Sequence, residues 1–168
     1  MLTLELMQLF FREKGIAMKT VVQRVTKAQV LVDDKVIGKI NGGLMALVGF
    51  VDTDGKKTYE YMIDKLINLR IFEDDQGKLN RSVLEVDGGI LIVPNFTLYA
   101  DCRQGRRPSF TASAKPEMAS LQFKEFVELF RKSFPKLQIG EFQAYMQVEL
   151  INDGPITLII EADRDVKI

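Results

Sequence analysis

The pattern of hydrophobic and polar residues predicts a protein rich in β-strands with two helices. Apolar and β-branched runs indicate strands at residues 20–25, 28–32, 35–40, 44–51, 82–86, 90–93, 95–97, 143–151 and 156–161. Helical spacing of apolar residues predicts a helix over residues 59–69 and a second that begins at Pro116, because proline suits the first helical turn. The predicted fold class is therefore α+β.

The first residues stand apart from this pattern. The strand-like pattern starts directly after Met18, so residues 18–168 are expected to form a single domain and residues 1–17 an N-terminal extension. The extension is interpreted either as a short amphipathic helix or as the product of a start codon assigned upstream of Met18. Glu5 interrupts its apolar run and no basic region precedes it, which argues against a signal peptide.

Composition narrows the chemistry mainly through what is missing. The formal net charge is zero, so any contact with a polyanion has to come from a local patch. The sequence has no histidine, which excludes a Ser-His-Asp triad and a His-ligated zinc site. Its single cysteine, Cys102, excludes an internal disulfide and favours the reducing cytosol as the compartment.

Two segments carry candidate chemistry. Arg103, Arg106 and Arg107 form a basic segment framed by glycine and proline, which is either solvated surface or a phosphate contact. In the segment VPNFTLYAD, Pro94 interrupts a buried strand, so nearby main-chain N–H groups could be left to serve as oxyanion donors. An edge strand that tolerates a proline is the simpler alternative.

The dipeptide Gly154-Pro155 is unusual for its position. It lies between two strand-like runs in the segment NDGPIT, where a two-residue Asn-Gly or Asp-Gly hairpin would be ordinary. Proline removes a donor from the β-ladder and restricts the residue before it. The pattern alone gives no structural reason for this choice.

Six short blocks, taken together, resemble a known family. VVQRV, NLRIFED, FTLYAD, GRRPSF, AYMQV and NDGPIT occur in this order, and the match runs from about Met18 to about Ala162. The chain is thereby similar to the D-aminoacyl-tRNA deacylases. The resemblance implies an α+β fold with mixed, mostly antiparallel sheets, and a cytosolic homodimer that uses no metal or organic cofactor. It also implies hydrolysis of the ester that joins a D-amino acid, or glycine, to the 3′-terminal adenosine of tRNA, with the adenosine 2′-hydroxyl helping to activate water.

The resemblance assigns roles to particular residues. Gly154 and Pro155 would form a cis peptide that reaches into the active site of the partner subunit and rejects L-aminoacyl groups by collision with their side chains. Phe142 and Met146 would contact the adenosine, although packing in the core is an equally ordinary role for them.

One motif departs from the family pattern of Ser-Gln-x-x-Leu. Pro94 replaces the serine and Asn95 replaces the glutamine. The main-chain N–H groups of Asn95, Phe96 and Thr97 are retained, so these three residues are expected to provide the catalytic donors, with the Thr97 hydroxyl at the centre of the site. Two alternatives remain open: a tRNA 3′-end-binding module that has lost turnover, and a related deacylase with an altered amino-acid preference.

Overall fold

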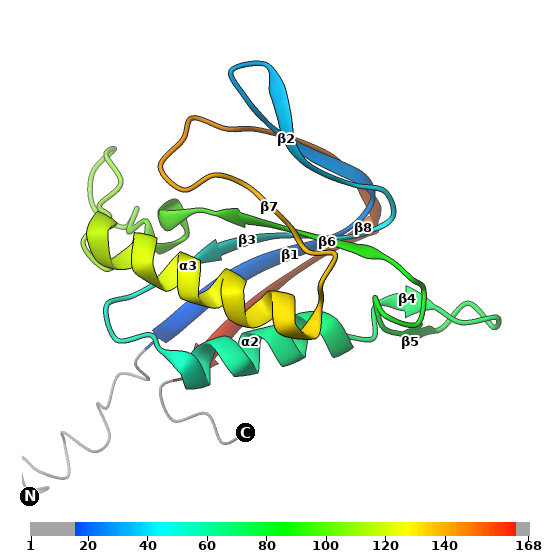
Figure 1. The fold of residues 1–168 in the computed structure, drawn as a ribbon. Coiled ribbons are helices and arrows are strands. Elements are labelled where there is room, and N and C mark those ends of the chain that lie inside the picture. The colour runs from blue at the N-terminus through cyan, green and yellow to red at the C-terminus, as the bar shows by residue number, and fades with distance from the viewer. Residues whose placement is uncertain (1–15, 164–168) are drawn as a thin grey trace, which may run out of the picture.

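A computed structural model describes residues 16–163 of the chain. One long strand, β1 (Ile16–Val32), is central to the fold. Two helices lie on one face of a six-stranded sheet (Figure 1). The helices are α2 (Lys56–Asn68) and α3 (Pro116–Ser133), and a short 3-10 helix, η1, covers Phe96–Tyr99. The strands are β1 (Ile16–Val32), β2 (Lys35–Ile40), β3 (Gly43–Gly49), β4 (Phe72–Glu73), β5 (Leu79–Arg81), β6 (Gly89–Pro94), β7 (Gln138–Ile139) and β8 (Gln147–Asp163).

Strand β1 is hydrogen-bonded on both edges. Strand β8 runs antiparallel along one edge, from the pair Ile16↔Asp163 to the pair Leu31↔Gln147. The other edge is shared between β3 and β2, both antiparallel to β1. Strand β6 then pairs parallel to β3, and β7 pairs parallel to β6. The expected α+β class with mixed, mostly antiparallel sheets is confirmed.

Alternate residues of the central strands supply two separate cores. Leu44 and Ala46 of β3 face the two helices, while Met45 between them faces away, as the two-residue period of a strand requires. On the helix side, Phe126 of α3 packs edge-to-face against Phe50 at a ring-centroid distance of 5.9 Å. On the other side, Met45 belongs to a smaller cluster against which Met146 packs.

Three predicted strand segments have other conformations. Residues 82–86 form a turn, because the Ser82 N–H donates to the Glu85 carboxylate at 2.6 Å and the Glu85 N–H to the Ser82 hydroxyl at 3.4 Å, a capping-box arrangement. Residues 95–97 enter η1 instead of continuing the strand. Residues 143–146 precede β8 in a turn in which Gln143 has φ of 62°.

The start of the domain also differs from the prediction. Strand β1 begins at Ile16, and Ala17 is fully buried, so these two residues belong to the sheet and not to an extension. The rest of the predicted extension lies outside the described residues. In the part of the chain that the structure describes, neither helix is long and apolar enough to cross a membrane.

Candidate active site

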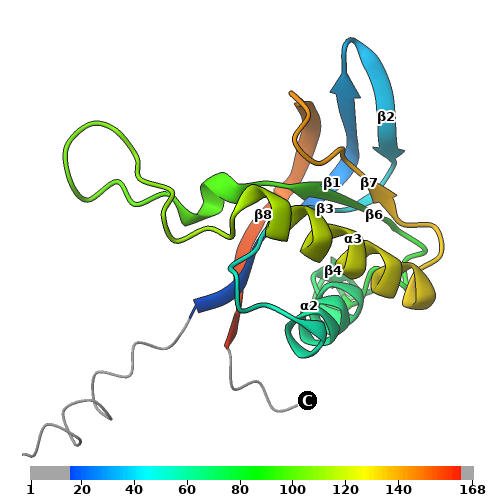
Figure 2. The same ribbon diagram turned by 60° about the vertical axis from the view of Figure 1, so that its left-hand side comes forward.

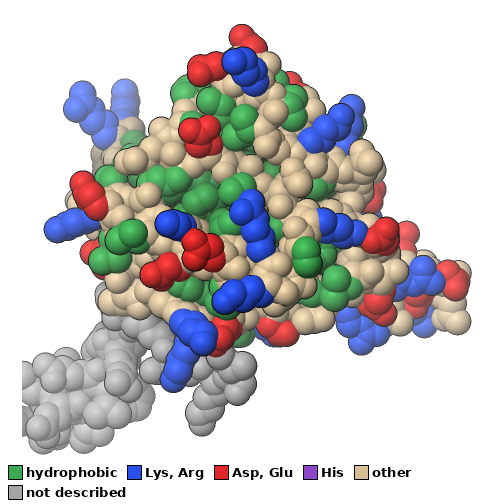
Figure 3. Space-filling model, viewed as in Figure 1, with side chains coloured by type: hydrophobic (Ala, Val, Ile, Leu, Met, Phe, Trp, Pro, Cys, Tyr) green, Lys and Arg blue, Asp and Glu red, His purple; other side chains and the backbone are tan. Residues whose placement is uncertain are grey.

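A cavity of about 780 Å³ opens where β3 and β6 end. Its walls come from these strand ends, the segment that leads into α3, and the segment that precedes β8. Hydrophobic side chains gather over this part of the surface, above α3 (Figure 3). Among the described residues that line it, one is a cation, Lys115, and none is a carboxylate. The cavity therefore suits a largely apolar group attached to an anion.

The wall nearest β8 is a tightly bonded turn. The Glu141 N–H donates to the Met146 sulfur at 3.3 Å, and the Ala144 N–H donates to the Glu141 carbonyl at 3.4 Å. Phe142 stacks on Phe123 of α3 with ring centroids 6.1 Å apart. A Cβ atom at Gly140 would lie 2.8 Å from the Met146 sulfur, so the absence of a side chain there lets the turn close.

The wall at the end of β6 is the segment in which Pro94 and Asn95 replace the Ser-Gln of the family motif. The Asn95 N–H donates to the Val48 carbonyl at 2.7 Å, which ends the strand pairing. The Asn95 side-chain oxygen then accepts from the Thr97 N–H at 3.1 Å and from the Thr97 hydroxyl at 2.6 Å. This is an N-cap, for which the short asparagine side chain is well suited, and it starts η1. Pro94 lines the cavity with Asn95 and Phe96.

A buried tyrosine fixes the far end of η1. The Tyr99 hydroxyl donates to the carbonyl of Ala17 at 2.7 Å, and it lies 3.2 Å from the carbonyl of Gly49. Burial raises the pKa of the Tyr99 phenol well above its usual value, so the group stays protonated and remains a donor. The 3-10 helix is thus attached at both ends to the strands that carry the cavity.

The Gly154-Pro155 peptide is cis and lies in an outward bulge of β8. Between the pairs Gln23↔Thr157 and Val25↔Asn152, β1 advances two residues while β8 advances five, so residues 153–156 leave the ladder opposite Arg24. Both Gly154 and Pro155 are exposed. Neither lines the cavity of its own chain.

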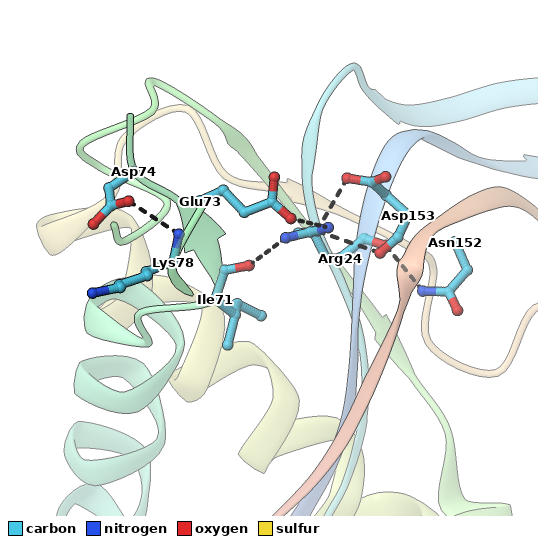
Figure 4. A network of polar contacts seen from close by, with 7 residues as sticks. All are labelled: Arg24, Ile71, Glu73, Asp74, Lys78, Asn152 and Asp153. Carbon is cyan, nitrogen blue, oxygen red and sulfur yellow. Dashed lines mark hydrogen bonds and ion pairs between the residues drawn. The ribbon is translucent and has the colours of Figure 1, made fainter. Parts of the chain in front are cut away.

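Arg24 lies beside this bulge, between Asp153 on one side and Ile71 and Glu73 on the other (Figure 4). It is 6% exposed, and its guanidinium contacts the Asp153 carboxylate at 3.0 Å, the Asp153 carbonyl at 3.3 Å and the Ile71 carbonyl at 2.9 Å. The Asn152 side chain donates to the Arg24 carbonyl at 3.0 Å and to the Ile156 carbonyl at 2.9 Å. These bonds satisfy polar groups that the break in the ladder would otherwise leave unpaired.

The basic segment forms an exposed loop that projects from the body of the molecule (Figure 2). A bridge between Asp101 and Ser109 closes its base. Arg103 contacts the Asp101 carboxylate at 2.9 and 2.7 Å, and these bonds lower the pKa of Asp101 to about 2. Arg103 therefore stabilises the base of the loop, while Arg106 and Arg107 are exposed near its tip.

Comparison with known proteins agrees with this geometry. The family model described as D-Tyr-tRNA(Tyr) deacylase matches residues 21–161. The D-aminoacyl-tRNA deacylases of Thermosipho melanesiensis and Thermosipho africanus are 51% and 48% identical to this chain, each over 88% of it and 99% of their own length. The chain belongs to the D-Tyr-tRNA(Tyr) deacylase family. Members of this family are hydrolases, and the chain is one of them.

Solved structures support the same fold. The structure of c-Myc DNA unwinding element binding protein has a TM-score of 0.81 and 39% identity, over 86% of this chain and 98% of its own. A probable eukaryotic D-amino acid tRNA deacylase has a TM-score of 0.75 at 17% identity, over 88% of this chain and all of its own, and shows the likeness of fold alone.

The deacylase cavity brings together several residues predicted from sequence. Asn95, Phe96, Phe142 and Met146 all line it. Thr97 does not: it is exposed, and its hydroxyl is bonded to the Asn95 side chain. The Asn95 cap thus engages the Thr97 hydroxyl, and its place at the centre of the site stays a prediction.

The three expected main-chain donors differ in their partners. The N–H groups of Asn95 and Thr97 already have acceptors within the chain. The Phe96 N–H is the one of the three for which residues 16–163 provide no hydrogen-bond acceptor. The catalytic role of all three stays a prediction, and the Phe96 N–H is the donor most open to a ligand.

Sequence reasoning missed the role of Arg24 in supporting the Gly154-Pro155 bulge. The available signal was an arginine within the apolar, strand-like run VVQRV, because a charged side chain in a central strand requires buried partners. Lys115, at the exposed rim of the cavity, gave no comparable signal, and Tyr145 was covered only by the block AYMQV, which assigned it no role.

Replacing Arg24 by lysine is expected to loosen the bulge without unfolding the protein. Lysine keeps the charge, but its single ammonium group cannot reach the Asp153 carboxylate and the Ile71 carbonyl at once, as the separate N–H groups of the guanidinium do. We expect a loss of about 1–3 kcal/mol in the free energy of unfolding, and faster amide hydrogen exchange at residues 152–156. Lys19→Arg is the matched control, because Lys19 lies on the same strand and pairs with Glu161 at 3.0 Å. Unchanged exchange in Arg24→Lys would contradict the supporting role.

Proposed function

We propose that this protein hydrolyses the ester that joins a D-amino acid, or glycine, to the 3′-terminal adenosine of tRNA. The observation that carries the proposal is the apolar cavity, which contains no carboxylate and has the unengaged Phe96 N–H at its edge. The aminoacyl adenosine at the end of tRNA has a flat aromatic base, an uncharged ester group and a phosphate on its 5′ side, and Lys115 of the cavity lining would meet that charge. Phe142 and Met146 supply the wall for the base.

The reaction needs positioning more than side-chain chemistry. Water adds to the ester carbonyl carbon, the bond to the ribose 3′-oxygen breaks, and that oxygen takes up a proton to leave as a hydroxyl. The negative charge that develops on the carbonyl oxygen is stabilised by the Phe96 N–H. The 2′-hydroxyl of the adenosine orients the attacking water, and the products are the free amino acid and tRNA.

The Gly154-Pro155 bulge provides the chiral filter from a second subunit. Because neither residue lines the cavity of its own chain, a contact with the substrate requires a partner copy. Exposed apolar side chains of β8 flank the bulge at Ile151, 49% exposed, and Ile159, 68% exposed, and they offer a surface on which such a copy could pack. Carbonyl groups of the bulge would accept from the amine of a D-residue and collide with the side chain of an L-residue. Glycine has no side chain and would pass.

The loop tip supplies the remaining contact with tRNA. Arg106 and Arg107 are exposed on a loop whose base is closed by Asp101 and Ser109, so they can meet phosphate groups outside the cavity. A protein of zero net charge needs such a local patch to attract a polyanion. We place this activity in the cytosol, where an exposed free thiol such as Cys102 stays reduced.

Deacylation of matched D-tyrosyl-, L-tyrosyl- and glycyl-tRNA by the purified protein tests the function directly. We expect release of D-tyrosine and glycine, and retention of L-tyrosine, at a rate unaffected by EDTA. Hydrolysis of the L ester at a similar rate would indicate an altered preference. Binding of tRNA without release of any amino acid would instead indicate the non-catalytic binding module.

The role of the Phe96 N–H can be separated from that of its ring. Phe96→Pro removes both, and proline is tolerated at the first position of a helix. Phe96→Ala removes only the ring. Loss of one oxyanion donor lowers kcat by about 10²–10³-fold, so we expect that loss in Phe96→Pro and a much smaller one in Phe96→Ala. Equal activities of the two variants would exclude the main-chain donor.

A heterodimer purified through two different tags tests whether the Gly154-Pro155 bulge of one subunit acts on the cavity of the other. One subunit carries Phe96→Pro and the other Pro155→Ala, which by itself is expected to relax the rejection of L-tyrosyl-tRNA. If the filter acts in trans, the only working cavity receives an intact Pro155 from the Phe96→Pro subunit and discriminates as the wild type does. If it acts within one chain, the same cavity keeps its own alanine and hydrolyses the L ester.

A further inference from the structure

Tyr145 is the most exposed large hydrophobic side chain in the described part of the chain, with 88% of its surface accessible. It lies at the rim of the cavity, next to Met146. Burial of a tyrosine ring stabilises a fold, so a ring left almost wholly in water contributes little to this one. At the rim of the cavity its face is open to a bound ligand.

The turn holds Tyr145 outward. Phe142 and Met146 on either side are half-buried, and Gln143 takes a positive φ of 62° that redirects the chain between them. The bonds from Glu141 to the Met146 sulfur and from Ala144 to the Glu141 carbonyl keep this turn closed. The ring is therefore presented by a fixed backbone, which reduces the entropy lost when a ligand binds.

The other aromatic side chains at the rim already have ring partners. Phe96 and Phe110 pack edge-to-face with centroids 5.2 Å apart. Tyr145 has no ring or cation contact with any of the described residues. Its π-face is thus available for stacking, in a rim that carries a cation, Lys115, and no carboxylate.

We propose that Tyr145 stacks on the unpaired nucleobase that precedes the terminal adenosine of the substrate tRNA. The proposal rests on the proposed function, which places the adenosine itself against Phe142 and Met146. In a single strand the next base lies one stacking distance outside that position and is joined to it by a phosphate. Stacking on an aromatic ring accepts any base, since every base has a π-face.

The experiment compares a substrate that has this base with one that lacks it. D-tyrosyl-tRNA contains the penultimate nucleotide, whereas D-tyrosyl-adenosine does not. Stacking on one base corresponds to about 5–150-fold in binding. We therefore expect Tyr145→Ala to raise KM for D-tyrosyl-tRNA by roughly tenfold or more, with kcat unchanged, and to leave hydrolysis of D-tyrosyl-adenosine as it was. Tyr145→Phe should behave as the wild type.

A fluorescence readout makes the test independent of catalysis. The chain has no tryptophan, so Tyr145→Trp introduces a single reporter. We expect uncharged tRNA to quench its emission, adenosine to leave it unchanged, and an RNA with an abasic penultimate position to quench far less. Failure of the wild type to cleave any ester would refute the proposed function, while the fluorescence would still report whether the ring meets that base.

Two controls complete the design. Leu121→Ala alters an exposed apolar residue of α3 that does not line the cavity. We expect it to leave KM and kcat unchanged for both substrates. Arg106→Ala with Arg107→Ala should weaken the salt dependence of tRNA binding, which Tyr145→Ala should leave intact. Equal losses on both substrates, no loss on either, or dissociation of a dimer by Tyr145→Ala would overturn the proposal.

Discussion

The hydrogen-bonded pairing of β1 with β8 determines where every part of the site lies. Strand β1 pairs with β8 on one edge and with β3 on the other, so its register fixes the Gly154-Pro155 bulge and the cavity at the same time. The bulge faces Arg24, and the cavity reaches to the level of Leu47, which pairs with Val21 three residues earlier along β1. Three residues of extended chain correspond to roughly 10 Å. The two features are therefore held apart within one chain.

This arrangement places a charge where a sheet ordinarily has none. A buried guanidinium is unfavourable unless its donors are satisfied, and the interruption of the β8 ladder supplies free carbonyl groups at that level. Arg24 and the bulge consequently depend on each other. The arginine has acceptors because β8 bulges, and the bulge keeps its shape because the arginine binds it. Glu73, 3.9 Å from the guanidinium and largely exposed, adds a weaker, solvent-screened contact.

The elements that were located correctly from the sequence are those in which apolar residues recur at the spacing of a strand or a helix. The strands around Val30, Met45 and Leu91 follow from periodicity, and the helix that begins at Pro116 follows from periodicity and from the proline at its first turn. The failures share a different cause, which is local side-chain bonding to the backbone. Ser82 and Glu85 close a turn, and Asn95 starts a 3-10 helix, although the apolar content of both segments reads as strand.

The site was predictable only where a motif carried it. Phe142 and Met146 could be placed through resemblance to deacylases, and the structure brings both to the cavity. Which loop covers the end of the sheet is set by tertiary packing, so no pattern revealed Lys115, and the block AYMQV contained Tyr145 without giving it a role. Nor could a sequence show that Asn95 caps Thr97, since that depends on the backbone direction after Pro94.

The composition of the cavity also bears on what happens after hydrolysis. The ester that enters is uncharged at its carbonyl, but the amino acid that forms carries a new carboxylate. Walls made largely of apolar side chains, with Lys115 as the single cation among them, solvate that charge far less well than water does. We expect the free amino acid to be bound more weakly than the ester from which it formed. Such a site would clear after each turnover, and free amino acids in the surrounding solution would compete poorly for it.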